Sequence, residues 1–189
     1  TCKIRLLPKM EDTISLAVAL QDAGCSMLTV HGRTRHQMHD RTGMADWEAI
    51  HTLKTKLNIP VVANGSIEVF ADVAACLDAT GADGVMSSEG ILENPAIFDA
   101  DMAKEEDIDQ RQLSLAKRYL ELATEHEAPL KNVRAHMNKI LFRFFCSKTA
   151  PIEALEVRRR LNQRDGSLGK QVHALETIAE LVSTGAASG

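Results

Sequence analysis

The sequence predicts an α/β fold, namely the C-terminal half of a TIM (β/α)8 barrel followed by a small all-helical domain. Over residues 1–86, four short apolar strands alternate with helical segments, and beyond Pro95 only helical periodicity remains. Four βα units are half of a barrel that takes about 250 residues in full, so we expect the first barrel half to precede Thr1. We place the domain boundary between residues 103 and 104.

The first part of the chain reads as strand and helix in strict alternation. Strands are predicted at 2–7, 27–30, 59–63 and 82–86, and helices at 11–23, 46–57 and 68–79. Asp12 and Asp46 suit helix N-caps, Gly24 and Gly81 suit helix ends, and residues 31–44 read as a loop. An open doubly wound sheet is the alternative, but no glycine-rich dinucleotide turn follows any strand, which favours the barrel.

The second part of the chain reads as helices only. We predict them at 110–126, 130–146, 151–163 and 168–183, and Asn94-Pro95 can open a further one. In the helix 130–146, one stripe is apolar and predicts core packing. Another face carries Asn132, His136, Lys139 and Arg143, which suits either a phosphate backbone or an ordinary solvated surface.

Composition limits the classes of function. The chain has 189 residues, of which 44% are hydrophobic, and its apolar runs fall short of the ~18–20 residues of a membrane span. Four cysteines lack a CxxC pair, so we expect buried, reduced thiols. His36, His39 and Asp40 match no metal-site spacing, and we expect no metal. We expect a monomer in the cytoplasm, or in the nucleus of a eukaryotic cell.

Charge is distributed unevenly along the chain. The net charge is −4, but residues 131–170 carry ten Lys or Arg and three acids, a net +7. Such asymmetry indicates that one part of the chain meets a polyanion, although a solvated helical surface would look the same.

Polar residues follow the predicted strands where barrel proteins carry their function, at the carboxyl ends. They are Lys3 and Arg5, then His31 to Arg35, then Asn64-Gly65-Ser66, then Ser88-Glu89-Gly90. Cations, an imidazole, an amide and glycine turns suit a planar, phosphorylated anion, held partly by backbone N–H groups. The alternatives are a solvated Lys3, a structural His31 and an Asn64-Gly65 that only makes a turn.

Five motifs in order resemble the tRNA-dihydrouridine synthase family. They are Cys2-Lys3-Ile4-Arg5, residues 29–35, residues 43–47 ending in Ala-Asp-Trp, residues 60–67 and residues 84–95. The Ser-Glu-Gly turn and Val133-Arg134-Ala135-His136 look most like the branch that modifies D-loop positions 16 and 17. The resemblance implies an FMN-binding barrel with a helical tRNA-binding domain.

The resemblance also implies roles for individual residues. Lys3 would stabilise negative charge on the reduced flavin, and His31 would contact the same cofactor. The FMN phosphate would be held by Asn64, Gly65, Ser88, Glu89 and Gly90, although most relatives have arginine at the position of Glu89. The tRNA would meet Arg33 and Arg35, together with Arg134, His136 and Lys139 of the helical domain.

The implied reaction reduces a D-loop uridine to 5,6-dihydrouridine with hydride from FMNH₂, which NADPH regenerates. The family's catalytic cysteine would precede Thr1, so no catalytic residue is assigned to this chain, and we expect the chain alone to be inactive. Two alternatives stay open. One is another FMN barrel oxidoreductase, dihydroorotate dehydrogenase-like, that acts on a free pyrimidine, although it would not need the basic helical tail. The other is a truncated RNA-binding protein without catalysis.

Overall fold

A computed structural model describes residues 1–37, 43–104, 108–146, 152–162 and 167–183, except for the Cys146 side chain. The chain divides into two compact units, Thr1–Gly90 and Ile91–Gly189, which are described separately below. The first is α/β with a parallel sheet, as predicted, and the secondary-structure elements of the described part of the second are helices.

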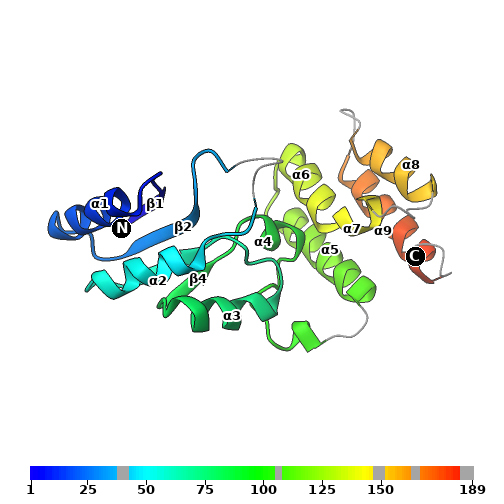
Figure 1. Ribbon diagram of the computed structural model, residues 1–189. Helices are drawn as coiled ribbons and strands as arrows, with labels where there is room; N and C mark the ends of the chain where they lie inside the picture. Colours follow the sequence, from blue (N-terminus) through cyan, green and yellow to red (C-terminus); the bar gives the residue numbers. More distant parts are fainter. Residues whose placement is uncertain (38–42, 105–107, 147–151, 163–166, 184–189) are drawn as a thin grey trace. The chain divides into compact units, whose positions relative to one another are not determined.

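A four-stranded parallel sheet forms the first unit, with its strands in the order β1-β2-β3-β4 (Figure 1). Its elements are β1 (Cys2–Leu6), α1 (Met10–Asp22), β2 (Leu28–Thr34), α2 (Trp47–Lys56), β3 (Val61–Asn64), α3 (Phe70–Thr80) and β4 (Gly84–Met86). Each strand pairs with the next one along the chain, and a helix precedes each new strand. This is the βα order predicted from the sequence.

The two faces of the sheet differ in chemistry. Side chains alternate between faces along a strand, and paired residues of parallel neighbours share a face. One face carries Leu28, Val30, Val61 and Ala63, all with 0% exposure. The opposite face carries polar side chains at its carboxyl edge, so burial on one face orients the polar residues of the other.

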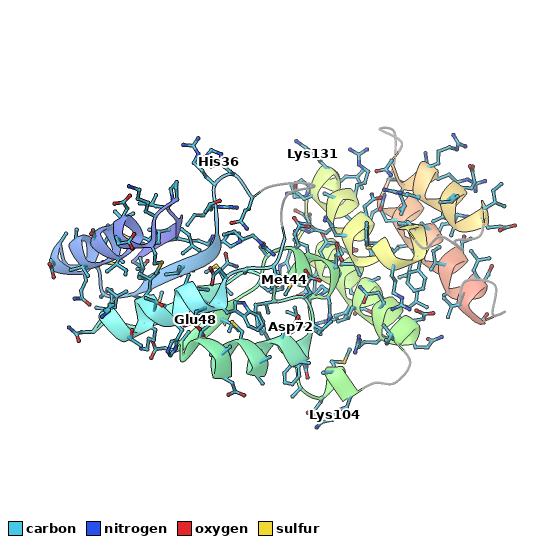
Figure 2. All side chains as sticks on the ribbon, viewed as in Figure 1. His36, Met44, Glu48, Asp72, Lys104 and Lys131 are labelled. Atoms are coloured by element: carbon cyan, nitrogen blue, oxygen red, sulfur yellow. The ribbon has the colours of Figure 1, made fainter. Side chains whose placement is uncertain are left out.

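Helix boundaries in the first unit follow local hydrogen bonds. Asp46 caps α2 as predicted, because its Oδ1 accepts from the Ala49 N–H at 2.8 Å. At α3, the Asp72 carboxylate accepts from the N–H groups of Glu68 and Val69, so the helix begins at Phe70 rather than at 68 (Figure 2).

The loop prediction for residues 31–44 is wrong at its start. β2 continues through His31 to Thr34 because β1 still pairs with it there, with a register shift between Arg5 and Leu6. The Arg5 guanidinium also donates to the Thr34 carbonyl at 3.0 Å. His31 and Arg33 therefore lie on a strand, where their side chains are held in place.

Packed helices form the second unit around one apolar core. They are η2 (Met102–Lys104), α5 (Ile108–Glu125), α6 (Leu130–Ile140), α7 (Phe142–Cys146), α8 (Ile152–Leu161) and α9 (Leu168–Ser183), while α4 (Glu89–Glu93) contains the division between the units. Val133, Met137, Ile140, Phe144 and Phe145 lie in the core, which confirms the predicted apolar stripe.

The single helix predicted over 130–146 is interrupted at Leu141. The buried side-chain amide of Gln112 donates to the Ile140 carbonyl, the acceptor that the Phe144 N–H would use in a continuous helix. Phe144 N–H instead donates to the Leu141 carbonyl at 3.1 Å. A contact between distant residues therefore divides the helix into α6 and α7.

The segment after β4 also differs from the prediction. Asn94 does not open a helix, because its side chain accepts from the Ala96 N–H at 3.1 Å and its carbonyl from the Ile97 N–H at 3.0 Å, which makes a turn. Gln112 also donates to the carbonyl of Glu93. These contacts place the segment 91–103 with the helical unit, before the predicted boundary at 103/104.

Candidate functional site

A row of polar side chains crosses the carboxyl edge of the sheet. Arg5 pairs with His31, His31 with Asn64, and Asn64 with Met86, so these residues share one face of adjacent strands. Lys3 lies two residues before Arg5 and therefore on the same face. The structure thus places Lys3, His31 and Asn64 on one face of the sheet, but Lys3 lies near the start of β1 and not at its carboxyl end, where the strand-end argument expected it.

His31 is the electrostatic centre of this row. Its partial burial is the largest cause that lowers the pKa of His31 to about 4, and the positive charges of Arg5, Lys3 and Arg33 act in the same direction. The Nη1 of Arg33 lies 3.2 Å from His31 Nε2. Because a guanidinium only donates, Nε2 accepts and the ring proton is on Nδ1. His31 is therefore a neutral imidazole of one defined tautomer at pH 7.

Arg33 is held by three partners within the first unit. Besides His31, its Nη2 donates to Ser66 Oγ at 3.1 Å, and its Nε donates to the Gly43 carbonyl at 3.0 Å. These contacts connect β2, the segment before α2 and the turn after β3. The structure therefore gives Arg33 a positioning role, whereas the predicted tRNA contact of Arg33 stays a prediction.

The turn after β3 has a backbone that favours glycine. Gly65 has φ +109°, and a Cβ there would lie 2.8 Å from the Ala45 Cβ and 3.0 Å from His31 Cδ2. Ser66 follows with φ +57°. The Trp47 indole N–H donates to the Gly65 carbonyl at 3.1 Å and thereby braces the turn. Gly65 is the residue that allows the backbone to approach the His31 ring.

A hollow of about 120 Å³ opens beside this turn. Its lining comes from the ends of β2, β3 and β4 and includes His31, Asn64, Gly65, Ser66 and the residues 86–90. Ligand pockets are usually about 300–1,000 Å³, so this hollow would take one group of a ligand, such as a phosphate, rather than a whole cofactor. Glu68 and Glu89 also line it, so backbone and neutral donors would have to meet an anion there.

The remaining predicted cofactor residues occupy different environments. Asn64 is buried, and its Nδ2 donates to the Met86 carbonyl at 2.8 Å. Ser88 and Glu89 are exposed and Gly90 is buried, all at the rim of the hollow. Lys3 is exposed on the open face of the sheet.

Some contributors were missed by the sequence argument. Trp47 was given no role at the site, yet its indole braces the Gly65 turn. Ser87 was also missed; its hydroxyl donates to the Ile67 carbonyl at 2.8 Å and joins the β3 and β4 turns. The only signals were the single tryptophan of the chain and a serine next to the phosphate-turn motif.

The predicted tRNA residues fall in two groups. Arg35 is exposed in the turn just after β2, next to His36 (Figure 2). On α6, the exposed His136 forms a hydrogen bond through its Nδ1 with the Tyr119 hydroxyl, at 2.8 Å. The two rings meet edge to face. Arg134 is half-buried, and the Lys139 ammonium lies 3.6 Å from a Glu93 carboxylate oxygen.

The described parts of the chain hold neither a cluster of metal ligands nor a helix that could span a membrane. Among them, no three His, Cys, Asp or Glu side chains gather as metal ligands do. His39 and Asp40 lie outside the described residues. None of the helices that these parts form combines the length and the apolar character needed to cross a bilayer.

Comparison with known proteins identifies the family. The sequence model of dihydrouridine synthase (Dus) matches residues 1–184. A mouse protein named tRNA-dihydrouridine(16/17) synthase-like is 44% identical over 140 residues, which are 74% of this chain and 28% of that protein. The tRNA-dihydrouridine(16/17) synthase of Saccharomyces cerevisiae is 37% identical over 147 residues, 75% of this chain and 35% of its own length.

A bacterial relative shows the same likeness over a shorter stretch. The probable tRNA-dihydrouridine synthase 1 of Synechocystis is 51% identical over 82 residues, which are 43% of this chain and 22% of that protein. The chain spans about a third of the length of the two 16/17 relatives. These matches confirm the family and the branch that the five motifs predicted. The chain belongs to the dihydrouridine synthase family.

Proposed function

We propose that this chain is the cofactor-holding and tRNA-binding portion of an enzyme that reduces uridine to dihydrouridine in the tRNA D-loop, at positions 16 and 17. The relatives named for these positions support the substrate. The single observation that carries the proposal is the shared face of Lys3, Arg5, His31 and Asn64 on one parallel sheet, with the last three at its carboxyl edge. In this proposal the sheet is the C-terminal half of a TIM barrel.

The donor set fits FMN as the cofactor. Lys3, Arg5 and Arg33 place positive charge around a neutral imidazole, and the adjoining hollow has the size of one polar group. When bound, FMN supplies the hydride, and the NAD(P)(+) in the relatives' names supports NADPH as its reductant.

Each residue of the chain would contribute by position and charge. Lys3 would face the ring edge where negative charge develops, since a fixed cation there stabilises the reduced form. His31, kept neutral by its surroundings, offers its Nδ1–H as a donor without adding charge. The Gly65 turn and residues 88–90 would hold the phosphate through backbone N–H groups, because carboxylates also line the hollow.

The helical unit would supply the grip on tRNA. An extended nucleic acid needs many separate phosphate contacts, and the basic residues of 131–170 provide them. The target base must leave its stack to reach a flavin, so binding and base extrusion need both units of the chain. A free pyrimidine would need only the first unit.

The experiment compares full-length proteins that contain this chain and carry Lys3→Met or Lys9→Met. Lys9 is an exposed lysine between β1 and α1 and serves as the matched control. Losing a charged hydrogen bond should weaken FMN binding roughly 10- to 100-fold in Lys3→Met alone. Equal flavin content and equal dihydrouridine formation in both variants would refute the cofactor role.

A second measurement tests the substrate. Unmodified tRNA and free pyrimidines are offered to the wild-type enzyme with NADPH, and dihydrouridine is mapped by position. The proposal expects product at positions 16 and 17 of tRNA. Turnover of the free pyrimidine instead would establish the oxidoreductase alternative, and RNA binding without flavin or product would establish the non-catalytic one.

A further inference from the structure

Two cysteines meet at the amino edge of the sheet, at the opposite ends of the strands from His31 and Asn64. Cys2 begins β1, and Cys25 lies just before β2. The Cys25 Sγ lies 3.1 Å from the carbonyl oxygen of Met27, and the backbone N–H of Cys2 donates to the same oxygen at 3.2 Å. Two residues far apart in sequence therefore converge on one atom, and both are free thiols.

Local structure holds Cys25 in this place. Gly24 ends the α1 turn with φ +95°, and the Cys25 N–H donates to the Leu20 carbonyl at 3.0 Å. The register of β1 on β2 places Cys2 opposite Leu28, so its position is set by the sheet. Both side chains are half-buried, whereas Cys76, a residue of α3, is fully buried.

The two thiols also influence each other's ionisation. The neighbouring Cys25 thiol is the largest cause that raises the pKa of Cys2. The pKa of Cys25 is lowered, chiefly through hydrogen bonding with the Met27 backbone, with the Cys2 thiol acting in the same direction. Burial raises the pKa of Cys76. Cys25 is therefore the thiol of the three that reaches the reactive thiolate form most readily.

We propose that Cys2 and Cys25 are a thiol modification site that closes into a reversible disulfide, joining the start of β1 to the start of β2. Its ligand class is a small-molecule disulfide such as oxidised glutathione. The proposal does not depend on the proposed enzymatic function.

The exchange is balanced in atoms and electrons. The Cys25 thiolate attacks one sulfur of oxidised glutathione, which breaks the S–S bond, releases one glutathione thiolate and leaves a mixed disulfide. The Cys2 thiolate then attacks the Cys25 sulfur and releases the second glutathione. Cys2 and Cys25 together lose two electrons and two protons, and one oxidised glutathione becomes two reduced ones.

The closed form would act on stability rather than on the cofactor site. The bond would enclose α1 in a covalent loop, which restricts the unfolded chain more than the folded one. We expect oxidation to raise the melting temperature by about 2–8 °C. Flavin content should not change, because the Cys2 side chain lies on the opposite face of β1 from its neighbour Lys3 and at the opposite ends of the strands from His31 and Asn64.

The test treats the full-length protein with glutathione buffers of increasing oxidised fraction, blocks remaining thiols and maps peptides. Trypsin cuts after Lys3, Lys9 and Arg33, so Cys2 and Cys25 fall on separate peptides. Wild type should yield the linked peptide pair at least about tenfold above any other cysteine pair. Reduction should reverse it.

Variants make the assignment specific. Cys76→Ser should leave the linked pair intact, whereas Cys2→Ser should replace it with a glutathione adduct on Cys25 and abolish the rise in melting temperature. Cys2→Ala, with circular dichroism of both variants, controls for misfolding. Glutathione adducts on wild-type Cys25 without the linked pair, or a bond from Cys2 to another cysteine, would overturn the proposal.

Discussion

The carboxyl edge of the sheet and the helical unit both carry cations, but the two regions use them differently. At the sheet edge, the positive charges of Arg5, Lys3 and Arg33 act on one imidazole and help to lower its pKa to about 4. In the helical unit, Lys139 lies near Glu93 and Arg143 bonds to Asp109 at 2.7 Å. Concentrated charge suits a compact ligand, and distributed charge suits an extended polyanion. The predictions below test this contrast.

The largest effect is expected at Gly65. Gly65→Ala places a Cβ 2.8 Å from Ala45 and 3.0 Å from the His31 ring, at φ +109°. We expect a loss of about 2 kcal/mol or more in unfolding free energy and at least tenfold weaker FMN binding, measured by urea unfolding and flavin titration. Gly24→Ala is the matched control, since Gly24 has φ +95° but nothing within 4 Å of a Cβ. Equal losses in both would show that the close approach to His31 is unimportant.

The second-largest effect is expected for a substitution in the helical unit, which should lower stability without changing the cofactor site at the sheet edge. Gln112→Ala leaves the carbonyls of Glu93 and Ile140 without their side-chain donor. We expect a loss of about 1–3 kcal/mol in unfolding free energy. Flavin affinity should stay at the wild-type value. The exposed Ser114→Ala on the same helix is the control, and a stable Gln112→Ala protein would contradict the account of the α6–α7 break.

The third prediction concerns pH and the sheet edge. The pKa of His31 is about 4 in the folded protein and near 6.5 in the unfolded chain, so between these values only the unfolded chain binds the proton. Stability should therefore rise with pH between about 4 and 6.5, and His31→Gln should remove that part of the slope. Ring NMR signals of His31 should not titrate above pH 6. Arg33→Gln should raise the pKa of His31, because it removes one of the positive charges that lower it. Titration of wild-type His31 near 6.5 would contradict the clustered cations.

The smallest effect is expected for the distributed cations of α6. Replacing Arg134 and Lys139 with Ala should weaken tRNA binding only a few-fold at physiological salt. The double substitution should also reduce the slope of the logarithm of the binding constant against the logarithm of the salt concentration by about 2, because two phosphate contacts are lost. Lys104→Ala with Lys117→Ala, two exposed lysines of the same unit, is the control pair. An unchanged slope in the α6 variant would remove this surface from the proposed RNA interface.

Local sequence signals determined much of the fold and part of the site. Alternation placed Lys3 and Arg5 on one face, Asp46 capped α2 through its own side chain, and Gly81 ended α3 with φ +63°. These features depend on residues close together in the chain, whose preferences do not change when the rest of the protein folds. The order of strands and helices followed from the same signals, whereas the family followed from the resemblance of five motifs to known sequences.

Tertiary contacts decided what local signals could not. β2 reaches Thr34 because β1 lies beside it, and the helix 130–146 breaks because Gln112 takes the Ile140 carbonyl. The neutral state of His31 and the meeting of Cys2 with Cys25 arise in the same way. In each case the deciding partner is more than twenty positions away in the sequence or on another strand. Hydrogen bonding and charge act through space, and only folding brings such groups within their range.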